Sequence, residues 1–165
     1  MCLKRLLTEE LVLCAPTFNG TPFILIMDGS KEGFGAVLAQ QFSAWLPDGE
    51  VKCVVHLIGY VSKHSSLAEE HYKPYILEFA ALKFGLDHFS ETIWGFPVEV
   101  ETDCLALHDT VHGDRPNWTR VQWWEGISLY HIAAICHHSG KTNVAADALS
   151  RMWSRCERTD YDGST

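Results

Sequence analysis

Residues 23–40, FILIMDGSKEGFGAVLAQ, begin with an apolar run that ends in an acid. A run of this kind is typical of a strand buried on both faces of a sheet. The glycines that follow interrupt it, and residues 34–45 have the pattern of a second strand. Pro47-Asp48-Gly49 is a turn sequence, because proline presets φ and glycine accepts a positive φ. With a third strand at 51–61, the sequence predicts an antiparallel meander.

The pattern becomes helical after this meander. Ser66-x-x-Glu69 resembles a capping box, and Pro74 suits the first turn of a longer helix that continues to about residue 90. Residues 97–103, PVEVETD, alternate between apolar and polar side chains. This alternation predicts a fourth strand, because successive side chains of a strand point to opposite faces.

The last third of the chain completes the predicted order of elements. It contains predicted helices at 104–112 and 117–129, a fifth strand at 132–136, and a final helix at 144–153 with Asn143 as its N-cap. The order is therefore β-β-β-α-β-α-β-α. It predicts an α/β fold with a five-stranded mixed sheet, three antiparallel strands followed by two parallel ones, flanked by helices.

Composition favours one globular domain in a reducing compartment. The chain has 165 residues, of which 47% are hydrophobic and 21% charged, and this suits a single core. No apolar run approaches the roughly 20 residues needed to span a membrane, and the N-terminus does not resemble a signal peptide. The six cysteines contain no Cys-x-x-Cys pair, so we predict free thiols and an intracellular protein.

Four acids are candidates for one metal site. Asp28 ends the first predicted strand, Asp103 ends the fourth, Asp147 lies in the first turns of the last helix, and Glu78 lies in the long helix. Ligands of open α/β sheets gather at strand ends, and hard cations such as Mg²⁺ prefer carboxylate oxygens. The alternative is that these acids are turn, capping or solvated surface residues, so spacing alone suggests a site without proving one.

The chain resembles the ribonuclease H domain of gypsy-type LTR-retrotransposon reverse transcriptases. The resemblance runs in order over most of the chain, and its last motif is the most specific. The stretches that carry it are residues 23–40, GYVS at 59–62, SLAE at 66–69 with Tyr72, LEFAA at 77–81, VETD at 100–103 and GKTNVAADALSR at 140–151. It implies a ribonuclease-H-like fold at 23–155, after a connector from the polymerase at 1–22 and before a loose tail at 156–165.

The resemblance implies an activity and a role for each acid. The domain would cut the RNA strand of RNA–DNA hybrids with two Mg²⁺ or Mn²⁺ ions, which can stabilise the attacking and leaving oxygens. Asp28 would bridge both ions, Glu78 and Asp103 would complete one, and Asp147 would hold the other. The implied partner is the polymerase domain of the same polyprotein, and the implied location is the cytoplasm or a virus-like particle.

Other candidates surround these acids. His137 lies where cellular and retroviral ribonucleases H carry a catalytic histidine; it either assists water deprotonation or product release, or is a surface residue. Gly29 replaces the family's usual alanine, and we expect it to loosen the turn after Asp28. The candidate nucleic-acid contacts, each equally suited to a solvated surface, are Ser30, Lys31, Lys63, Arg120, Lys141 and Asn143.

Alternatives to this interpretation stay open. A formal net charge of −8 is awkward for phosphate contact and predicts weak hybrid binding by the isolated domain. The negative charge also favours a catalytically silent structural or interaction module. Integrases and resolvases share the fold and the use of metal ions, but the ADALSR ending at 146–151 argues against them. Trp118, Trp123 and Trp124 suit core packing or base stacking. Cys136, His137 and His138 lack partners at zinc-finger spacing.

Overall fold

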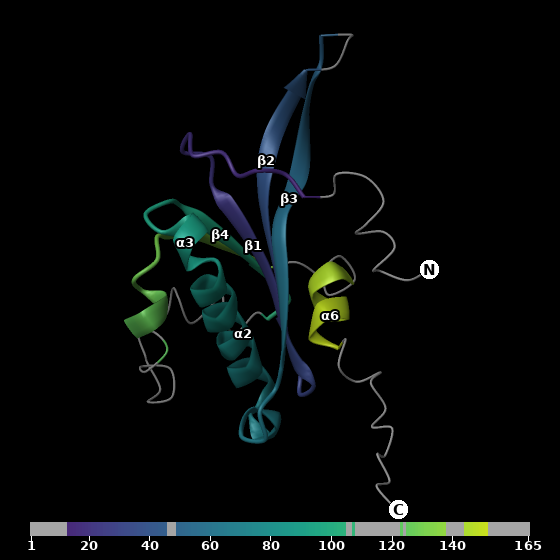
Figure 1. The fold of residues 1–165 in the computed structure, drawn as a ribbon, viewed down its shortest axis with the longest axis vertical. Coiled ribbons are helices and arrows are strands. Elements are labelled where there is room, and N and C mark those ends of the chain that lie inside the picture. Colours follow the sequence, from purple (N-terminus) through teal and green to yellow (C-terminus); the bar gives the residue numbers. More distant parts are fainter. Residues whose placement is uncertain are drawn as a thin grey trace, which may run out of the picture.

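The computed structural model describes residues 13–45, 49–104, 107, 123, 125–137 and 144–151. Its elements form a mixed five-stranded sheet in the order β3-β2-β1-β4-β5, with helices on both faces (Figure 1). This confirms the predicted fold. The elements are β1 (Phe23–Gly29), β2 (Gly33–Trp45), β3 (Val51–His64), η1 (Glu69–His71), α2 (Pro74–His88), α3 (Ser90–Ile93), β4 (Val98–Thr102), β5 (Ile132–His137) and α6 (Val144–Ser150).

The first three strands form the predicted antiparallel meander. In the β1–β2 pair, Phe23 lies opposite Gln40 and Asp28 lies opposite Gly35. The turn between them is closed by Ser30, whose N–H donates to the carbonyl of Gly33 at 2.9 Å. β3 is longer than predicted and continues to His64, because its pairing with β2 extends to the start of that strand.

The two remaining strands are parallel to β1, since β4 pairs with β1 and β5 pairs with β4. β4 alternates between buried and half-buried residues, as its sequence predicts. β1 carries three fully buried side chains on one face, those of Phe23, Leu25 and Met27. This central position explains the continuous apolar run, because both faces of β1 are covered.

The helices α2 and α6 lie on opposite faces of the sheet (Figure 1). On one face, a Cβ atom on Gly85 of α2 would contact the side chains of Leu25 and Ala36. On the other face, a Cβ atom on Gly35 would collide with the backbone of α6 at Ala146. Directly paired residues share a face, so Asp28, opposite Gly35, points toward α6.

The capping box and the proline position the long helix. The N–H of Ser66 donates to Oε2 of Glu69 at 2.7 Å, and the N–H of Glu69 donates to Oγ of Ser66 at 3.4 Å. This reciprocal pair lies at the start of the short helix η1, whose first residue is Glu69. The long helix α2 then begins at Pro74, where the missing N–H of proline costs no hydrogen bond because a first turn has no partner for it. α2 ends at His88, and the separate turn α3 completes the predicted helical stretch.

The residues before β1 are attached to the sheet. The fully buried side chain of Gln40 accepts a hydrogen bond from the N–H of Thr17 at 2.9 Å and donates to the carbonyls of Thr17 and Thr21.

The predicted domain boundaries stay predictions. Most of the helices expected at 104–112 and 117–129, and the tail at 156–165, lie outside the described residues. No described helix has the length and apolar character to span a bilayer.

Candidate metal centre

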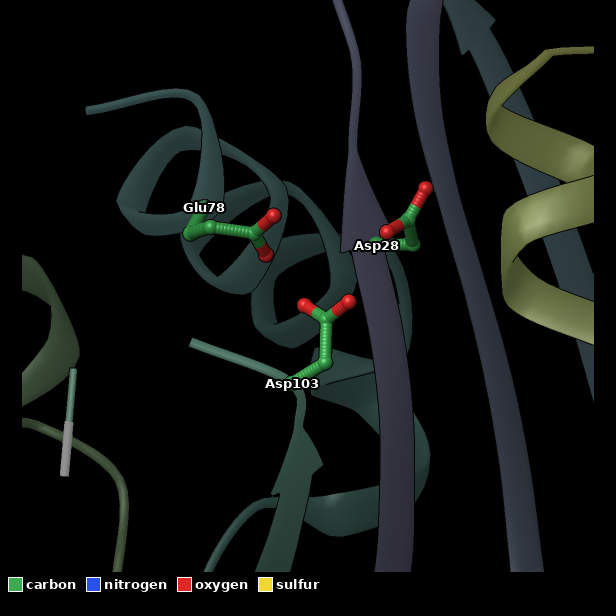
Figure 2. Close-up of side chains that lie close together, drawn as sticks. All are labelled: Asp28, Glu78 and Asp103. Atoms are coloured by element: carbon green, nitrogen blue, oxygen red, sulfur yellow. The ribbon is translucent and has the colours of Figure 1, made fainter. Parts of the chain in front are cut away.

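Three carboxylates meet at one edge of the sheet (Figure 2). They come from β1, from α2 and from the residue that follows β4. Asp28, Glu78 and Asp103 each offer one oxygen atom, and these atoms all lie within 4.8 Å of one another. Within the described part of the chain, this is the one group of acids, histidines or cysteines close enough to share a metal ion.

Parallel pairing brings two of these carboxylates together. Ile26 of β1 is paired with Glu101 of β4, and the two strands run in the same direction. Asp28 and Asp103 each follow two residues later, so both reach the same edge of the sheet. Sites in α/β proteins commonly form at this carboxyl end of parallel strands. The predicted convergence of these two acids therefore follows from the strand order.

Close packing of α2 against β1 brings in Glu78. Gly29, the last residue of β1, lies against the α2 backbone, where a Cβ atom would stand 2.7 Å from the carbonyl carbon of Leu77. The predicted loosening of the turn is wrong, because Gly29 belongs to the strand and permits a close helix–strand contact. The Gly29 N–H also hydrogen-bonds Glu78 and lowers its pKa.

Glu78 has an environment suited to a cation. Burial, with a further contribution from the nearby charges of Asp28 and Asp103, raises the pKa of its carboxyl to about 8. Its Oε2 is buried and has no hydrogen-bond partner among the described residues. An unsatisfied buried carboxylate oxygen is costly, and a divalent cation would both bind it and offset the repulsion. The donor set therefore fits a hard metal ion.

Asp28 is the buried centre of the group. Only 7% of its surface is exposed, and burial is the main cause that raises the pKa of its carboxyl. The hydroxyl of Ser150 in α6 donates a hydrogen bond to Oδ2 of Asp28, which opposes this rise. The charges of Asp103 and Asp147 raise the same pKa, so Asp28 interacts with an acid of its own group and with one of α6.

Asp147 lies beside this group but outside it. Its Oδ1 is 2.6 Å from Nε of Arg151, one helical turn further along, and the two side chains are 44% and 62% exposed. Asp147 still influences Asp28 electrostatically, as its effect on the Asp28 pKa indicates. The structure therefore brings three of the four predicted acids into contact range of one ion and leaves the fourth on the α6 side.

His137 lies at the same edge of the sheet. It is the last residue of β5, paired with Thr102, and its Nε2 is 3.1 Å from the backbone carbonyl oxygen of Asp103. The side chain is exposed. This position places an imidazole beside the backbone of Asp103, while its role stays a prediction.

The predicted nucleic-acid contacts have mixed surroundings. The Ser30 hydroxyl donates to the carbonyls of Gly33 and Ser150, so it ties the β1–β2 turn to α6. Lys31 is exposed, and Lys63 forms a 2.9 Å ion pair with Glu69. Arg120, Lys141 and Asn143 lie outside the described residues.

The remaining candidates are accounted for in part. Trp123 packs its ring against Tyr72, with the ring centroids 5.8 Å apart, which favours the packing interpretation for this tryptophan. Trp118, Trp124 and His138 lie outside the described residues. Cys136 belongs to no group of metal-binding side chains within the described ranges.

Sequence reasoning missed two residues that contact the acids. Ser150 and Arg151 belong to the ALSR end of the last motif, which we used only for its resemblance. They lie three and four residues after Asp147, the spacing at which helical side chains are neighbours. That spacing predicts a contact of Arg151 with Asp147, but nothing local predicts the hydrogen bond from Ser150 to Asp28.

Comparison with known proteins decides the family. The model of the RNase H-like domain found in reverse transcriptase matches residues 19–131. The chain belongs to this family. This RNase H-like domain is 31% identical to part of the retrovirus-related Pol polyprotein from transposon opus of Drosophila melanogaster. The match covers 98% of this chain and 15% of that polyprotein. The corresponding polyprotein from transposon gypsy of the same organism is 29% identical over 89% of the domain and 13% of that protein.

These matches confirm the resemblance to gypsy-type polyproteins and show that the domain spans only a small part of such relatives. A solved structure has the same fold at low identity. The N-terminal RNase H domain of a Mycobacterium tuberculosis protein superposes with a TM-score of 0.54 and 16% identity, covering 80% of this chain and 92% of that one. This likeness shows that the two domains share a fold.

Proposed function

We propose that this domain is an endonuclease that hydrolyses the RNA strand of RNA–DNA hybrids during reverse transcription of a retroelement. The observation that carries the proposal is the meeting of Asp28, Glu78 and Asp103 within 4.8 Å, at the edge where parallel strands end. The unsatisfied Oε2 of Glu78 supports it further, because a stable domain without a ligand gains nothing from burying such an atom.

We assign metal binding to the four acids and proton transfer to His137. Bound Mg²⁺ or Mn²⁺ ions would supply charge stabilisation for the attacking and leaving oxygens of the phosphodiester. Asp28, Glu78 and Asp103 would hold one ion, and Asp28 with Asp147 would hold the second on the α6 side. His137, held beside Asp103, would accept a proton from water or assist product release. The 2′-hydroxyl would mark the RNA strand.

The proposed setting is a longer reverse transcriptase. A net charge of −8 disfavours phosphate contact, so we expect the polymerase domain of the same polyprotein to supply much of the affinity for the hybrid. One of the lysines that we predicted as nucleic-acid contacts, Lys63, is paired with Glu69, which agrees with weak binding by the domain alone. The activity would operate in the cytoplasm or in a virus-like particle.

A catalytically silent structural or interaction module is the second candidate. Two observations favour it, the acidic net charge and the ion pair between Asp147 and Arg151. The buried acid Glu78 argues against it, since a silent domain would be more stable with an apolar residue at that position. Metal binding and hybrid cleavage separate the two candidates.

The test is cleavage of a labelled RNA–DNA hybrid in Mg²⁺ or Mn²⁺ by the 165-residue chain, compared with Asp28→Asn. Asp87→Asn is the matched control, because it neutralises an exposed α2 carboxylate that is paired with Lys83. Single-stranded RNA and duplex DNA serve as substrate controls. We expect cutting of only the hybrid's RNA strand, lost in Asp28→Asn and kept in Asp87→Asn.

Metal binding by titration calorimetry completes the test. If the chain binds Mn²⁺ but cuts only when joined to its polymerase domain, the endonuclease proposal stands with a partner requirement. If the chain neither binds Mn²⁺ nor cuts the hybrid at low salt and high concentration, the domain is a silent module and the proposal is wrong.

A further inference from the structure

Arg151 lies where its charge reaches several carboxylates at once. Its Nε is 2.6 Å from Oδ1 of Asp147. The guanidinium also lowers the pKa of Asp28 and that of Glu32, which lies in the β1–β2 turn. Together these effects place one positive charge on the α6 side of Asp28, beside the three-acid group.

We propose that Arg151 is an internal counter-cation of the metal centre, which holds Asp147 in the metal-free domain and competes with a second divalent ion for it. This inference rests on the proposed function and adds to it the residue that controls filling of the second ion position. The inference concerns the ion pair of Arg151 with Asp147, so it assigns Arg151 a regulatory contact rather than a catalytic one.

The pair can be released without unfolding the helix. Both side chains are largely exposed, at 44% for Asp147 and 62% for Arg151, and exposed pairs are weak because water screens them. The helix itself is fixed by other contacts. Ser62 donates to the carbonyl of Leu149 at 2.8 Å, and Ser30 donates to the carbonyl of Ser150 at 3.2 Å. Release of Asp147 from Arg151 therefore requires movement of two surface side chains and leaves α6 in place.

Asp147 is also oriented relative to Asp28. The Ser150 hydroxyl contacts both residues, since it lies near Oδ2 of Asp28 and 3.0 Å from the backbone carbonyl oxygen of Asp147. The raising effect of Asp147 on the pKa of Asp28 shows that the two carboxylates repel each other. In the metal-free domain Arg151 offsets this repulsion, and a divalent cation would offset it more strongly.

The test is titration calorimetry of Mn²⁺ into the full chain and its Arg151→Gln and Arg151→Lys variants. Lys83→Gln is the matched control, because it removes the lysine of another i,i+4 ion pair, with Asp87 on α2. We expect the weaker Mn²⁺ site to tighten by roughly 1.5- to fivefold in Arg151→Gln, the range that corresponds to loss of an exposed ion pair. Arg151→Lys and Lys83→Gln should stay near the wild-type affinity.

A double variant tests whether Arg151 changes the Mn²⁺ affinity through Asp147. In the background of Asp147→Asn, Arg151→Gln should no longer tighten Mn²⁺ binding, because the shared carboxylate is gone. Without metal, Arg151→Gln should lower the melting temperature slightly, and Mn²⁺ should raise it by more than in the wild type.

The outcomes separate this inference from the proposed function. Unchanged or weaker Mn²⁺ binding in a folded Arg151→Gln chain overturns the counter-cation role, while metal binding that depends on Asp28 would leave the nuclease proposal intact. A wild-type chain that binds no Mn²⁺ overturns both. If Arg151→Gln does not fold, its circular dichroism will show it, and Arg151→Met, which keeps an unbranched side chain without the charge, takes its place. Unchanged or weaker Mn²⁺ binding by a folded Arg151→Met chain would then refute competition by charge.

Discussion

Gly29 and Leu77 touch through their backbones, and this contact brings Glu78 to Asp28. A Cβ atom on Gly29 would stand 2.7 Å from the carbonyl carbon of Leu77 and 3.1 Å from the N atom of Glu78. Both distances lie inside van der Waals contact, so any side chain at this position requires the helix to move. The distance between β1 and α2 therefore determines whether the carboxylates of Asp28 and Glu78 are near enough to bind the same ion.

Gly29→Ala should accordingly weaken the metal centre. We expect a loss of about 1–3 kcal/mol in the free energy of unfolding, the usual cost of overpacking, and weaker Mn²⁺ binding because Glu78 moves away. Chemical denaturation and titration calorimetry measure these two effects. Gly59→Ala is the control, since its Cβ would meet only the ring of Phe89, at 3.0 Å. Full Mn²⁺ affinity in Gly29→Ala would show that the helix position is not limiting.

Ser150→Ala should weaken metal binding through Asp28. The variant removes the hydroxyl that donates to Oδ2 of the buried carboxylate, and a hydrogen bond to a charged group is worth about 1.5–3 kcal/mol. The ionised form of Asp28 is then less favoured, so Mn²⁺ should bind less tightly at pH 7. Ser62→Ala is the matched control, because Ser62 also anchors α6 but donates to the carbonyl of Leu149. Equal Mn²⁺ affinities in the two variants would contradict this role of Ser150.

Metal-free domain stability should fall as the pH rises from about 4.5 to 8. The pKa of Glu78 rises from 4.5 in the unfolded chain to about 8 in the folded one, so the folded state binds more protons in this window. The slope is at most about 1.4 kcal/mol per pH unit for one proton. Glu78→Gln should flatten it, and the exposed Glu91→Gln should not. Urea denaturation with a chelator at several pH values measures the slope, and a stability that rises with pH would refute the assignment.

Mg²⁺ should reverse this dependence. A bound cation favours the ionised carboxylates of Glu78 and Asp28, so added Mg²⁺ should stabilise the domain more at pH 8 than at pH 5. The same denaturation series, repeated with Mg²⁺ in place of the chelator, tests this.

His137→Ala should slow cleavage without changing metal binding. An imidazole that moves a proton contributes typically 10²–10⁴-fold, so we expect a loss of about 100-fold in the rate of hybrid cleavage and Mn²⁺ affinity within about twofold of wild type. The exposed His131→Ala, just before β5, is the control. An unchanged cleavage rate in His137→Ala would make His137 a surface residue.

Local sequence patterns were sufficient for most of the architecture. The apolar run of β1 and the alternation in β4 predicted strands of the right kind, and the capping box and Pro74 predicted where the helical part begins. These signals are readable because burial and backbone conformation act on neighbouring residues. The order of the elements then limited the topology, since parallel strands need a connecting segment such as α2 between them.

The site was predicted only in part. Asp28 and Asp103 follow the ends of strands that lie side by side, so their meeting could be expected from topology. Glu78 and Asp147 were candidates from their positions, and the resemblance supplied the role of each. The structure separates these two, because α2 packs tightly on β1, while Asp147 pairs with Arg151 on the opposite face.

The sequence by itself thus determined the order and type of the strands, the family, and the acids that belong to the candidate centre. Tertiary structure alone decided that Gly29 admits α2 to the site, that Ser150 binds Asp28 across 122 residues, and that one oxygen of Glu78 is buried without a described partner. The physical reason is that periodicity reports the burial of a residue within its own element. Distances between remote segments, and the pKa values that follow from them, depend on how those elements pack.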